Sequence, residues 1–210
     1  MRKPIIQKAT KDDLHAISDI FRECWNVDKL FSEEISQNFS YQYTLECYSH
    51  CTFCFISKIN DEIVGFMMGR NGNEYSIDES IMKEVNELKS ELNQYPPTAR
   101  CMQTLQDYYK SGYNKMKEQQ LDESHELVLF AVKNEYQGKG IGKELLFKSL
   151  EYLKECGLKE CFLLTDSSCT YQMYDKYNFK RQLETPFKFI LPESSFDIDL
   201  YVYTYDLTQL

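Results

Sequence analysis

The sequence predicts an α/β domain in which short strands and helices alternate. The chain has 210 residues, of which 42% are hydrophobic, and this is enough to bury a sizeable core in one domain. Several segments repeat apolar residues at helical spacing, and runs rich in β-branched and aromatic residues lie between them. The apolar run 127–132 is followed by three closely spaced glycines and a further helical pattern. We therefore expect residues 1–210 to form a single domain.

The N-terminal part of the chain is expected to contain a strand and two helices. A short apolar strand at residues 5–9 precedes Thr10, which can cap a helix together with Asp13 three positions later. Apolar residues then recur at helical spacing through residues 14–24. A second, weaker helical pattern covers residues 29–47.

A β-hairpin and a helical insertion follow. Strands at residues 52–59 and 62–70 are joined by Asn60-Asp61, a dipeptide typical of tight hairpin turns. Residues 71–124 form an acidic segment with two helical stripes that are separated by a pair of prolines, so we expect a helical hairpin inserted between two strands. This insertion is either a structural flap or a lid over a substrate cleft.

The C-terminal part is expected to alternate again between strands and helices. Residues 127–132 are apolar on both faces, as in a central strand, and a helix follows at residues 141–156. A second buried strand at residues 161–165 precedes a short helix at residues 169–177. Residues 200–207 form a strand rich in aromatic residues.

The charge balance excludes several kinds of partner. The chain carries 24 Lys and Arg residues against 33 Asp and Glu residues, a net charge of −9. Nucleic acids and anionic membranes attract cationic surfaces, so we expect neither as a partner. No apolar run approaches the roughly 20 residues of a transmembrane helix, and the first residues lack the apolar segment of a signal peptide. These features predict a soluble, cytoplasmic protein.

The cysteines raise the question of a metal site. Cys47, Cys51 and Cys54 have the C-x3-C-x2-C spacing of some iron–sulfur enzymes, and the neighbouring His50 would suit zinc. Against this, residues 52–57 have the composition of a strand, and no second ligand pair with metal spacing follows. We expect reduced, mostly buried thiols and no metal.

The glycine-rich run has the features of a phosphate-binding loop. Gly138, Gly140 and Gly142 occupy every second position between a predicted strand and the N-terminus of a predicted helix. Backbone N–H groups and the helix dipole favour an anion there, and Lys139 and Lys143 add cationic donors. The spacing matches neither the Rossmann fingerprint nor the P-loop. A pyrophosphate group is the expected ligand.

Two motifs resemble one known family. Residues 137–142 (QGKGIG) resemble the Q/R-x-x-G-x-G/A acyl-CoA loop of the GNAT superfamily of N-acetyltransferases. Residues 173–179 (MYDKYNF) resemble that family's second signature, L-Y-E-K-x-G-F. Asn178 stands where the family usually has Gly, and Asn tolerates the left-handed conformation that Gly adopts there. The resemblance is specific over residues 125–180, and the insertion is longer than in minimal members.

The resemblance implies a mixed, mostly antiparallel central sheet flanked by helices, in which two parallel central strands splay apart. These strands would be residues 127–132 and 161–165, and the pantetheine arm of acetyl-CoA would enter the gap between them. The backbone near Phe130, Ala131 and Val132 would bind that arm. The pyrophosphate would lie on residues of the glycine-rich loop: Gln137, Gly138, Lys139, Gly140, Ile141, Gly142 and Lys143.

The resemblance also implies roles in acyl transfer. Tyr174 matches the tyrosine that, in many family members, protonates the departing CoA thiolate, although it is also compatible with one more core aromatic. Glu126 opens the central strand, where some members place a general base. The adjacent His125 is a second candidate, and only one of the two can point into the cleft because neighbouring strand residues face opposite sides.

The leading hypothesis is an N-acetyltransferase that moves an acetyl group from acetyl-CoA to a primary amine of a small molecule or a peptide. The alternative is a non-catalytic acyl-CoA-binding regulatory module. The cleft would be walled by residues 12–47, by the insertion and by the loop at residues 186–196, and net acidity favours polyamines and other cationic amines. A homodimer through residues 200–207 is a further expectation, because an exposed aromatic edge strand tends to pair.

Overall fold

The computed structural model describes residues 3–74 and 77–210, whose strands form one sheet. The sheet has seven strands in the order β1-β2-β3-β4-β5-β7-β6. Only β4 and β5 run parallel, and all other neighbouring strands are antiparallel. The predicted mixed, mostly antiparallel sheet is therefore confirmed. The strands are β1 (Ile5–Lys8), β2 (Phe53–Ile59), β3 (Glu62–Asn71), β4 (His125–Val132), β5 (Glu160–Asp166), β6 (Lys180–Ile190) and β7 (Ser195–Asp206).

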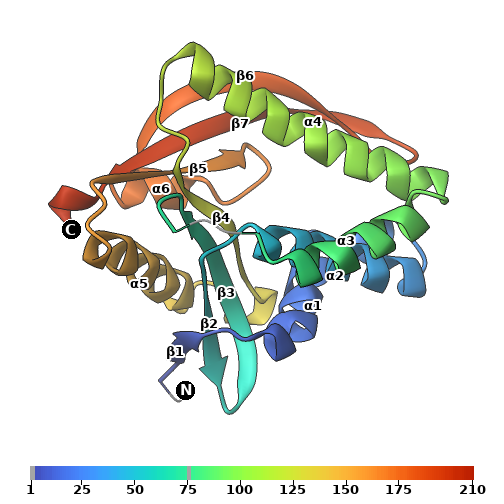
Figure 1. Cartoon of the computed structure of the whole chain (residues 1–210), viewed down its shortest axis with the longest axis horizontal. Helices are drawn as coiled ribbons and strands as arrows, with labels where there is room; N and C mark the ends of the chain where they lie inside the picture. The colour runs from blue at the N-terminus through green and yellow to red at the C-terminus, as the bar shows by residue number, and fades with distance from the viewer. Residues whose placement is uncertain (1–2, 75–76) are drawn as a thin grey trace.

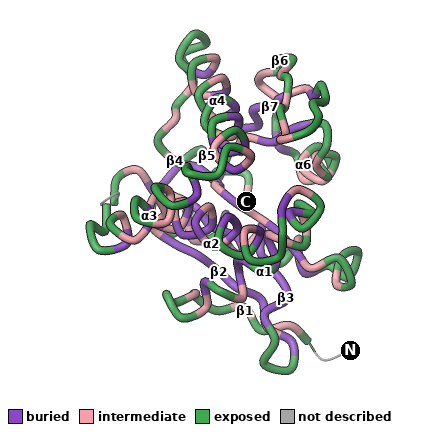
Figure 2. Tube along the Cα trace, turned by 90° about the vertical axis from the view of Figure 1, so that its right-hand side faces the viewer, coloured by how far each residue is buried: buried purple, intermediate pink, exposed green. Residues whose placement is uncertain are grey.

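The α-helices of the described residues lie on both sides of this sheet (Figure 1). They are α1 (Leu14–Cys24), α2 (Glu33–Ser49), α3 (Glu79–Leu92), α4 (Pro96–Glu118), α5 (Ile141–Glu155) and α6 (Gln172–Lys176). Helices α1, α2 and α3 cover one face of β2, β3 and β4, and α5 packs on the other face (Figure 1). Helix α4 lies along β6 and β7. Figure 2 shows that buried residues are concentrated in the strands of the sheet.

Local sequence explains several boundaries. The backbone N–H of Thr10 donates to the Asp13 carboxylate at 2.9 Å, so the predicted capping box is confirmed. Asn60 and Asp61 have φ angles of 52° and 65°, which a type I′ hairpin turn requires at both central positions. Pro96 occupies the first turn of α4, where a missing N–H costs nothing. The two prolines therefore begin α4 and also separate it from α3.

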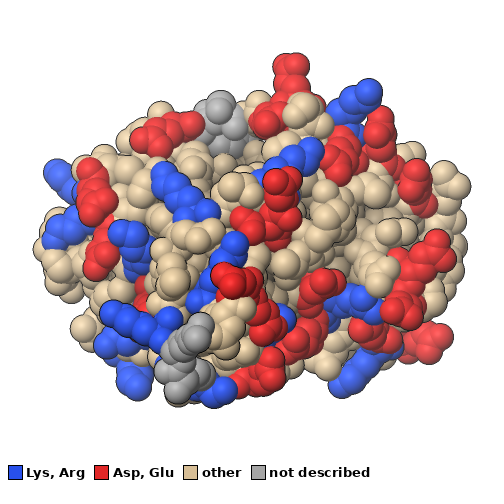
Figure 3. Space-filling view, turned by 90° about the horizontal axis from the view of Figure 1, so that it is seen from below, with Lys and Arg blue, Asp and Glu red and all other residues tan. Residues whose placement is uncertain are grey.

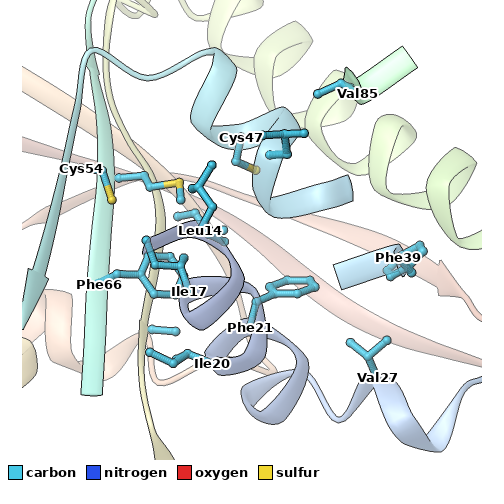
Figure 4. Close-up of a cluster of buried hydrophobic side chains, with 14 of the residues drawn as sticks. Leu14, Ile17, Ile20, Phe21, Val27, Phe39, Cys47, Cys54, Phe66 and Val85 are labelled. Atoms are coloured by element: carbon cyan, nitrogen blue, oxygen red, sulfur yellow. The ribbon is translucent and has the colours of Figure 1, made fainter. Parts of the chain in front are cut away.

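The core beneath α1 is built mainly from aliphatic and aromatic side chains (Figure 4). Leu14 and Ile17 of α1 are fully buried and pack together with Phe66 of β3. Cys47 and Cys54 belong to the same cluster, as the predicted buried thiols should. This core holds α1 and α2 against the sheet.

The insertion is a helical hairpin, α3 and α4, placed between β3 and β4 as predicted. Its α4 helix approaches β5 closely because Gly112 has no side chain: a Cβ there would lie 2.8 Å from the Leu164 side chain. Tyr108 of α4 also packs against Phe187 of β6, with ring centroids 5.6 Å apart. The insertion therefore spans both halves of the sheet.

The parallel pair β4–β5 meets at one point. Glu126 and Phe162 are its only residue pair in ladder register among the described residues, and beyond them the two strands have no paired residues. On its other side β4 carries a bulge, because Gly69 pairs with Leu127 while Met68 pairs with Leu129. The extra residue bends β4, and the gap that follows is the predicted splay.

The structure corrects two expectations about the C-terminal part. Strand β7, which contains residues 200–206 of the expected strand 200–207, lies between β5 and β6, so it has no free edge through which a second copy could pair. The predicted helix 169–177 is shorter, because Asp166 accepts hydrogen bonds from Ser168 N and Oγ and holds the chain in a turn first.

The surface carries both signs of charge. On the face seen in Figure 3, acidic and basic side chains are interspersed and form no continuous basic area. No helix in the described residues is long and apolar enough to span a membrane.

The neck of the insertion provides a test of this fold. Gly72 leaves β3 where Ser124 enters β4, and a Cβ on Gly72 would lie 2.5 Å from the Ser124 carbonyl oxygen. Because backbone must shift to make room, we expect Gly72→Ala to lower the free energy of unfolding by about 1–3 kcal/mol in urea denaturation. The exposed neighbour Asn73 is the control, and Asn73→Ala should change stability by no more than about 0.5 kcal/mol. Equal effects of both substitutions would contradict the close approach.

Candidate functional site

The loop between β4 and α5 has the backbone of an anion cradle. Gly138 and Gly140 have φ angles of 73° and 86°, a region that residues with side chains rarely adopt. No atom lies within 4 Å of the position that a Cβ would take at either glycine, so the surface above the loop is open. Helix α5 begins directly behind it and contributes the positive end of its dipole. The loop thus presents an open concavity to an anion.

The backbone N–H donors of this loop have no acceptor among the described residues. In the described part of the chain, no hydrogen bond joins the amide N–H groups of residues 138–143 to a protein acceptor. Lys139 folds back onto the Glu135 carbonyl at 2.5 Å, and Lys143 lies over the rings of Phe147 and Tyr177. These groups fit a pyrophosphate, which accepts several such hydrogen bonds.

Gln137 has a different place from the one its motif position implies. Its Nε2 donates to the Val132 carbonyl at 3.0 Å and to Asn134 Oδ1 at 3.1 Å. The side chain therefore ties the loop to the end of β4. The Val132 carbonyl also accepts from the Cys24 thiol at 3.4 Å, so this oxygen is already engaged.

The edge of β4 next to the gap continues from the loop. Phe130 and Val132 face α5, and the Phe130 ring would lie 3.1 Å from a Cβ on Gly142. Ala131 faces the opposite layer of helices. All three residues lie beyond the point where β4 and β5 separate, so β5 does not pair with their backbone, although the Val132 carbonyl is already engaged by Gln137 and Cys24.

A cleft of about 290 Å³ opens on the other side of the gap. Its walls come from α2, α3, α4, β3 and β4, which brings together residues from five separate stretches of the sequence. The lining residues are Gln42, Tyr43, Glu46, Cys47, His50, Arg70, Lys89, Met102, Leu105, Gln106, Tyr109, Tyr113, Glu126 and Val128. Of the expected wall 12–47, the α2 part from Gln42 to Cys47 lines this cleft and α1 does not, and the expected wall 186–196 does not line it.

Glu126 lies in this cleft and is only 1% exposed. Its carboxylate accepts from Arg70 Nη2 at 2.8 Å and from the Tyr113 hydroxyl at 2.8 and 3.0 Å. Burial raises the pKa of Glu126 above its ordinary value, while Arg70 and Tyr113 oppose that rise. His125 instead accepts from the Gly72 N–H through Nδ1 at 3.2 Å and does not line the cleft.

Tyr174 lies on the α5 side of the sheet. Its ring packs against Phe179 and Tyr203, with centroids 5.3 and 5.7 Å away. Burial raises the pKa of Tyr174 well above its ordinary value, so the hydroxyl stays protonated throughout the neutral range. Glu126 and Tyr174 therefore belong to opposite faces of the sheet, one on each side of the gap between β4 and β5.

Short polar contacts fix the helix that carries Tyr174. The Tyr203 hydroxyl donates to Asp175 at 2.8 Å, and Arg181 Nε donates to the same hydroxyl at 2.9 Å. Arg181 also stacks on the Tyr201 ring at 4.2 Å. Asn178, the residue that replaces the usual glycine, has a φ of 63° and adopts the predicted left-handed conformation.

The sequence alone did not reveal the partners of Glu126. Arg70 ends an apolar strand, and Tyr113 looked like one apolar position in a helical stripe. The antiparallel pairing of β3 with β4 places Arg70 beside Glu126, and α4, which crosses the sheet, brings Tyr113 to the same carboxylate. An isolated charge at the end of an apolar strand was the one available signal.

The cysteine cluster forms no metal centre in the described residues. Cys47 lines the cleft, and the Cys51 thiol donates to the Cys47 carbonyl at 3.0 Å. Cys54 is buried beside α1. Helix and strand geometry thus direct these thiols to different surroundings.

The glycine loop at a helix N-terminus and the neighbouring splayed parallel strands agree with the acyl-CoA-dependent acyltransferase that the sequence resemblance implied. The comparison with family models agrees: residues 14–179 match the acetyltransferase (GNAT) family. The chain belongs to this family and is an acyltransferase. A comparison with curated proteins gave no match.

Solved structures share the fold over nearly the whole chain at low identity. The PaiA N-acetyltransferase of Thermoplasma acidophilum, solved with coenzyme A, is 16% identical, with a TM-score of 0.55 and coverage of 98% of this chain and 99% of that one. YncA of Salmonella typhimurium, a putative acetyltransferase solved with acetyl-CoA, is 14% identical, with a TM-score of 0.55 and coverage of 98% and 95%. The ribosomal-protein-S18-alanine N-acetyltransferase of Escherichia coli is 12% identical, with a TM-score of 0.55 and coverage of 98% and 94%.

The buried ion pair predicts a pH-dependent loss of stability. We expect Arg70→Met to lower the free energy of unfolding by about 3 kcal/mol at neutral pH, because Glu126 would remain buried without its cation. The folded-state pKa of Glu126 would then rise further above its unfolded value of about 4.3. The loss of unfolding free energy in Arg70→Met should therefore be small near pH 4.3, where Glu126 is protonated, and should grow as the pH rises. Urea denaturation at about pH 7.5 and about pH 5 measures the difference.

The control for this prediction is an ion pair at the surface. Lys115 and Glu118 are 44% and 60% exposed, so Lys115→Met should cost no more than about 1 kcal/mol. A loss in Arg70→Met that did not vary with pH would show that Glu126 is not the group left behind.

Proposed function

We propose that this enzyme transfers an acetyl group from acetyl-CoA to a primary amine that binds in the cleft between α2, α3 and α4. The observation that carries the proposal is the position of Glu126. It belongs to the single residue pair that joins β4 and β5, and it lines the cleft on the side away from the glycine loop. An acyl donor in the gap and an acceptor in the cleft would therefore meet beside this carboxylate.

The chain's own groups suit acetyl-CoA. The amides of residues 138–143 and the dipole of α5 would hold the pyrophosphate, and the open edge at Phe130, Ala131 and Val132 would bind the pantetheine arm. When bound, acetyl-CoA supplies an acetyl thioester. We assign the binding role to Gly138, Lys139, Gly140, Ile141, Gly142 and Lys143, with Gln137 acting from beneath the loop.

The reaction also requires two proton transfers. Glu126 would accept a proton from the amine nitrogen as that nitrogen bonds to the acetyl carbon and the carbon–sulfur bond breaks. The raised pKa of Glu126 increases its basicity, and Arg70 keeps the carboxylate ionised until then. Tyr174, which its raised pKa keeps protonated, would donate the proton to the departing sulfur.

The insertion would have a functional role in this scheme. It supplies Lys89 and several α4 side chains to the cleft wall, which supports a lid over the substrate cleft rather than a structural flap. All eight cysteines are free, which fits a reducing compartment, and we place the enzyme in the cytoplasm.

The donor site is tested by acetyl-CoA binding. A ligand at about 100 times its dissociation constant should stabilise the folded protein by about 2.7 kcal/mol. We therefore expect acetyl-CoA to raise the Tm of the wild type. Gly140→Asp should remove this rise in Tm by placing a side chain and a negative charge in the cradle. Gly157→Asp is the matched control, because Gly157 also has a positive φ of 81° and an open Cβ position but ends α5. Loss of binding in both variants would contradict the assignment.

The chemical step is tested by separate acid and base variants. Tyr174→Phe and Glu126→Gln should each lower kcat by about 100-fold or more, since general acid or base catalysis contributes that much. Acetyl-CoA affinity should stay within about twofold, because neither group holds the nucleotide. Tyr171→Phe, in the turn before α6, should keep normal kcat. A wild-type protein that bound acetyl-CoA but acetylated no amine would be the non-catalytic module.

A further inference from the structure

The acceptor cleft contains two separate charged positions. The first is the Glu126–Arg70 pair, beside the point where β4 and β5 meet. The second is the pair between Lys89 of α3 and Glu46 of α2, whose Nζ and Oε1 atoms are 2.9 Å apart. Their side chains are 23% and 32% exposed, whereas the Glu126 side chain is 2% exposed. The Lys89 pair therefore lies nearer to solvent, at the rim.

The charge of Glu46 at the rim is already balanced by Lys89, whereas the lysine keeps N–H donors that no described residue uses. Glu46 receives Lys89 on Oε1 and the Gln42 amide on Oε2 at 2.7 Å, so each of its carboxylate oxygens already has a partner. The Lys89 ammonium has three N–H donors, and Glu46 is its one hydrogen-bond partner among the residues that the structure describes. The rim is therefore better suited to bind an anionic group than a second cation.

The overall charge of the cleft supports the same conclusion. Two acids, Glu46 and Glu126, are matched by two cations, Arg70 and Lys89. His50 adds no charge near neutral pH, because burial lowers its pKa. A polyamine would bring several positive charges into a cleft with no excess acid. The expectation of polyamines from the net charge of −9 does not extend to this site.

The middle of the cleft is apolar and limited in size. Met102, Leu105 and Val128 line it together with tyrosine rings, and the Tyr43 and Tyr109 hydroxyls bond each other at 2.6 Å. A volume of about 290 Å³ lies at the small end of ligand sites, which typically span about 300–1,000 Å³. A small molecule with a hydrocarbon body fits this space.

From these contacts we infer that the acceptor is a small amino carboxylic acid, whose amine lies beside Glu126 and whose carboxylate binds Lys89 at the rim. The inference rests on the proposed function and specifies its substrate class. Amine nitrogen bonds to acetyl carbon, the carbon–sulfur bond breaks, Glu126 takes the amine proton, and the acceptor carboxylate stays unchanged. Lys89 is then a specificity residue supplied by the insertion.

The test compares amines that differ only in the carboxylate. Phenylalanine, leucine and 5-aminopentanoate are assayed with acetyl-CoA against their decarboxylated partners 2-phenylethylamine, 3-methylbutylamine and butylamine, with thiol release as the readout. We expect at least one amino acid to exceed its decarboxylated partner by about tenfold or more in kcat/KM, since a charged hydrogen bond is worth that ratio. Lys89→Met should bring the ratio to within about twofold by lowering kcat/KM for the amino acids more than for the plain amines.

Lys83→Met provides the matched control, because Lys83 lies on the same helix and is 80% exposed. It should leave the preference intact. Calorimetric titration of the same amino acids into the protein with coenzyme A gives a second readout that does not require turnover.

The remaining outcomes overturn the inference in distinguishable ways. Preference for the plain amines, equal losses for both substrates in Lys89→Met, or no calorimetric binding would each contradict the inferred class. Acetylation of spermidine or a peptide N-terminus alone would also contradict it but would leave the proposed function standing. Failure to bind acetyl-CoA and to acetylate any amine would remove both.

Discussion

The loss of pairing between β4 and β5 is the constraint on which the rest of the site depends. A parallel pair at the centre of a sheet normally continues along both strands, yet here it is limited to Glu126 and Phe162. The bulge at Val128 bends β4 away from β5. The separation leaves backbone groups without β5 partners where a ligand can use them. The helical cleft lies at the start of β4 and the glycine loop follows its end.

The costs of this arrangement are confined to the site. The loop amides lack protein acceptors, and Glu126 is buried with its charge. Each feature disfavours the folded state and each prepares a contact with a ligand. The aliphatic clusters beneath α1 and α5 offset these costs. Stability and chemistry thus come from different parts of one sheet.

The helical insertion links the two halves of the molecule and shapes the cleft. Glu84 of α3 binds Lys11 and Tyr41 at 2.9 and 3.0 Å, which holds the insertion on the N-terminal helices. Its α4 helix packs on β6 and β7 and places Tyr113 on Glu126. A segment that differs in length from minimal family members therefore supplies both a support for the carboxylate and the rim cation. Specificity can change here without disturbing the donor site.

Local features of this protein were determined by the sequence itself. The capping box at Thr10, the Asn60-Asp61 turn and the left-handed Asn178 depend on φ angles and hydrogen bonds between near neighbours, so adjacent residues are sufficient to predict them. The glycine loop is also a local feature of this kind, because it depends on the positive φ angles of Gly138 and Gly140. The tertiary structure decided the place of β7 inside the sheet, the pairing of Arg70 with Glu126 and the rim position of Lys89. These depend on which distant strands pair and on how helices cross them, and no short stretch of sequence encodes that choice.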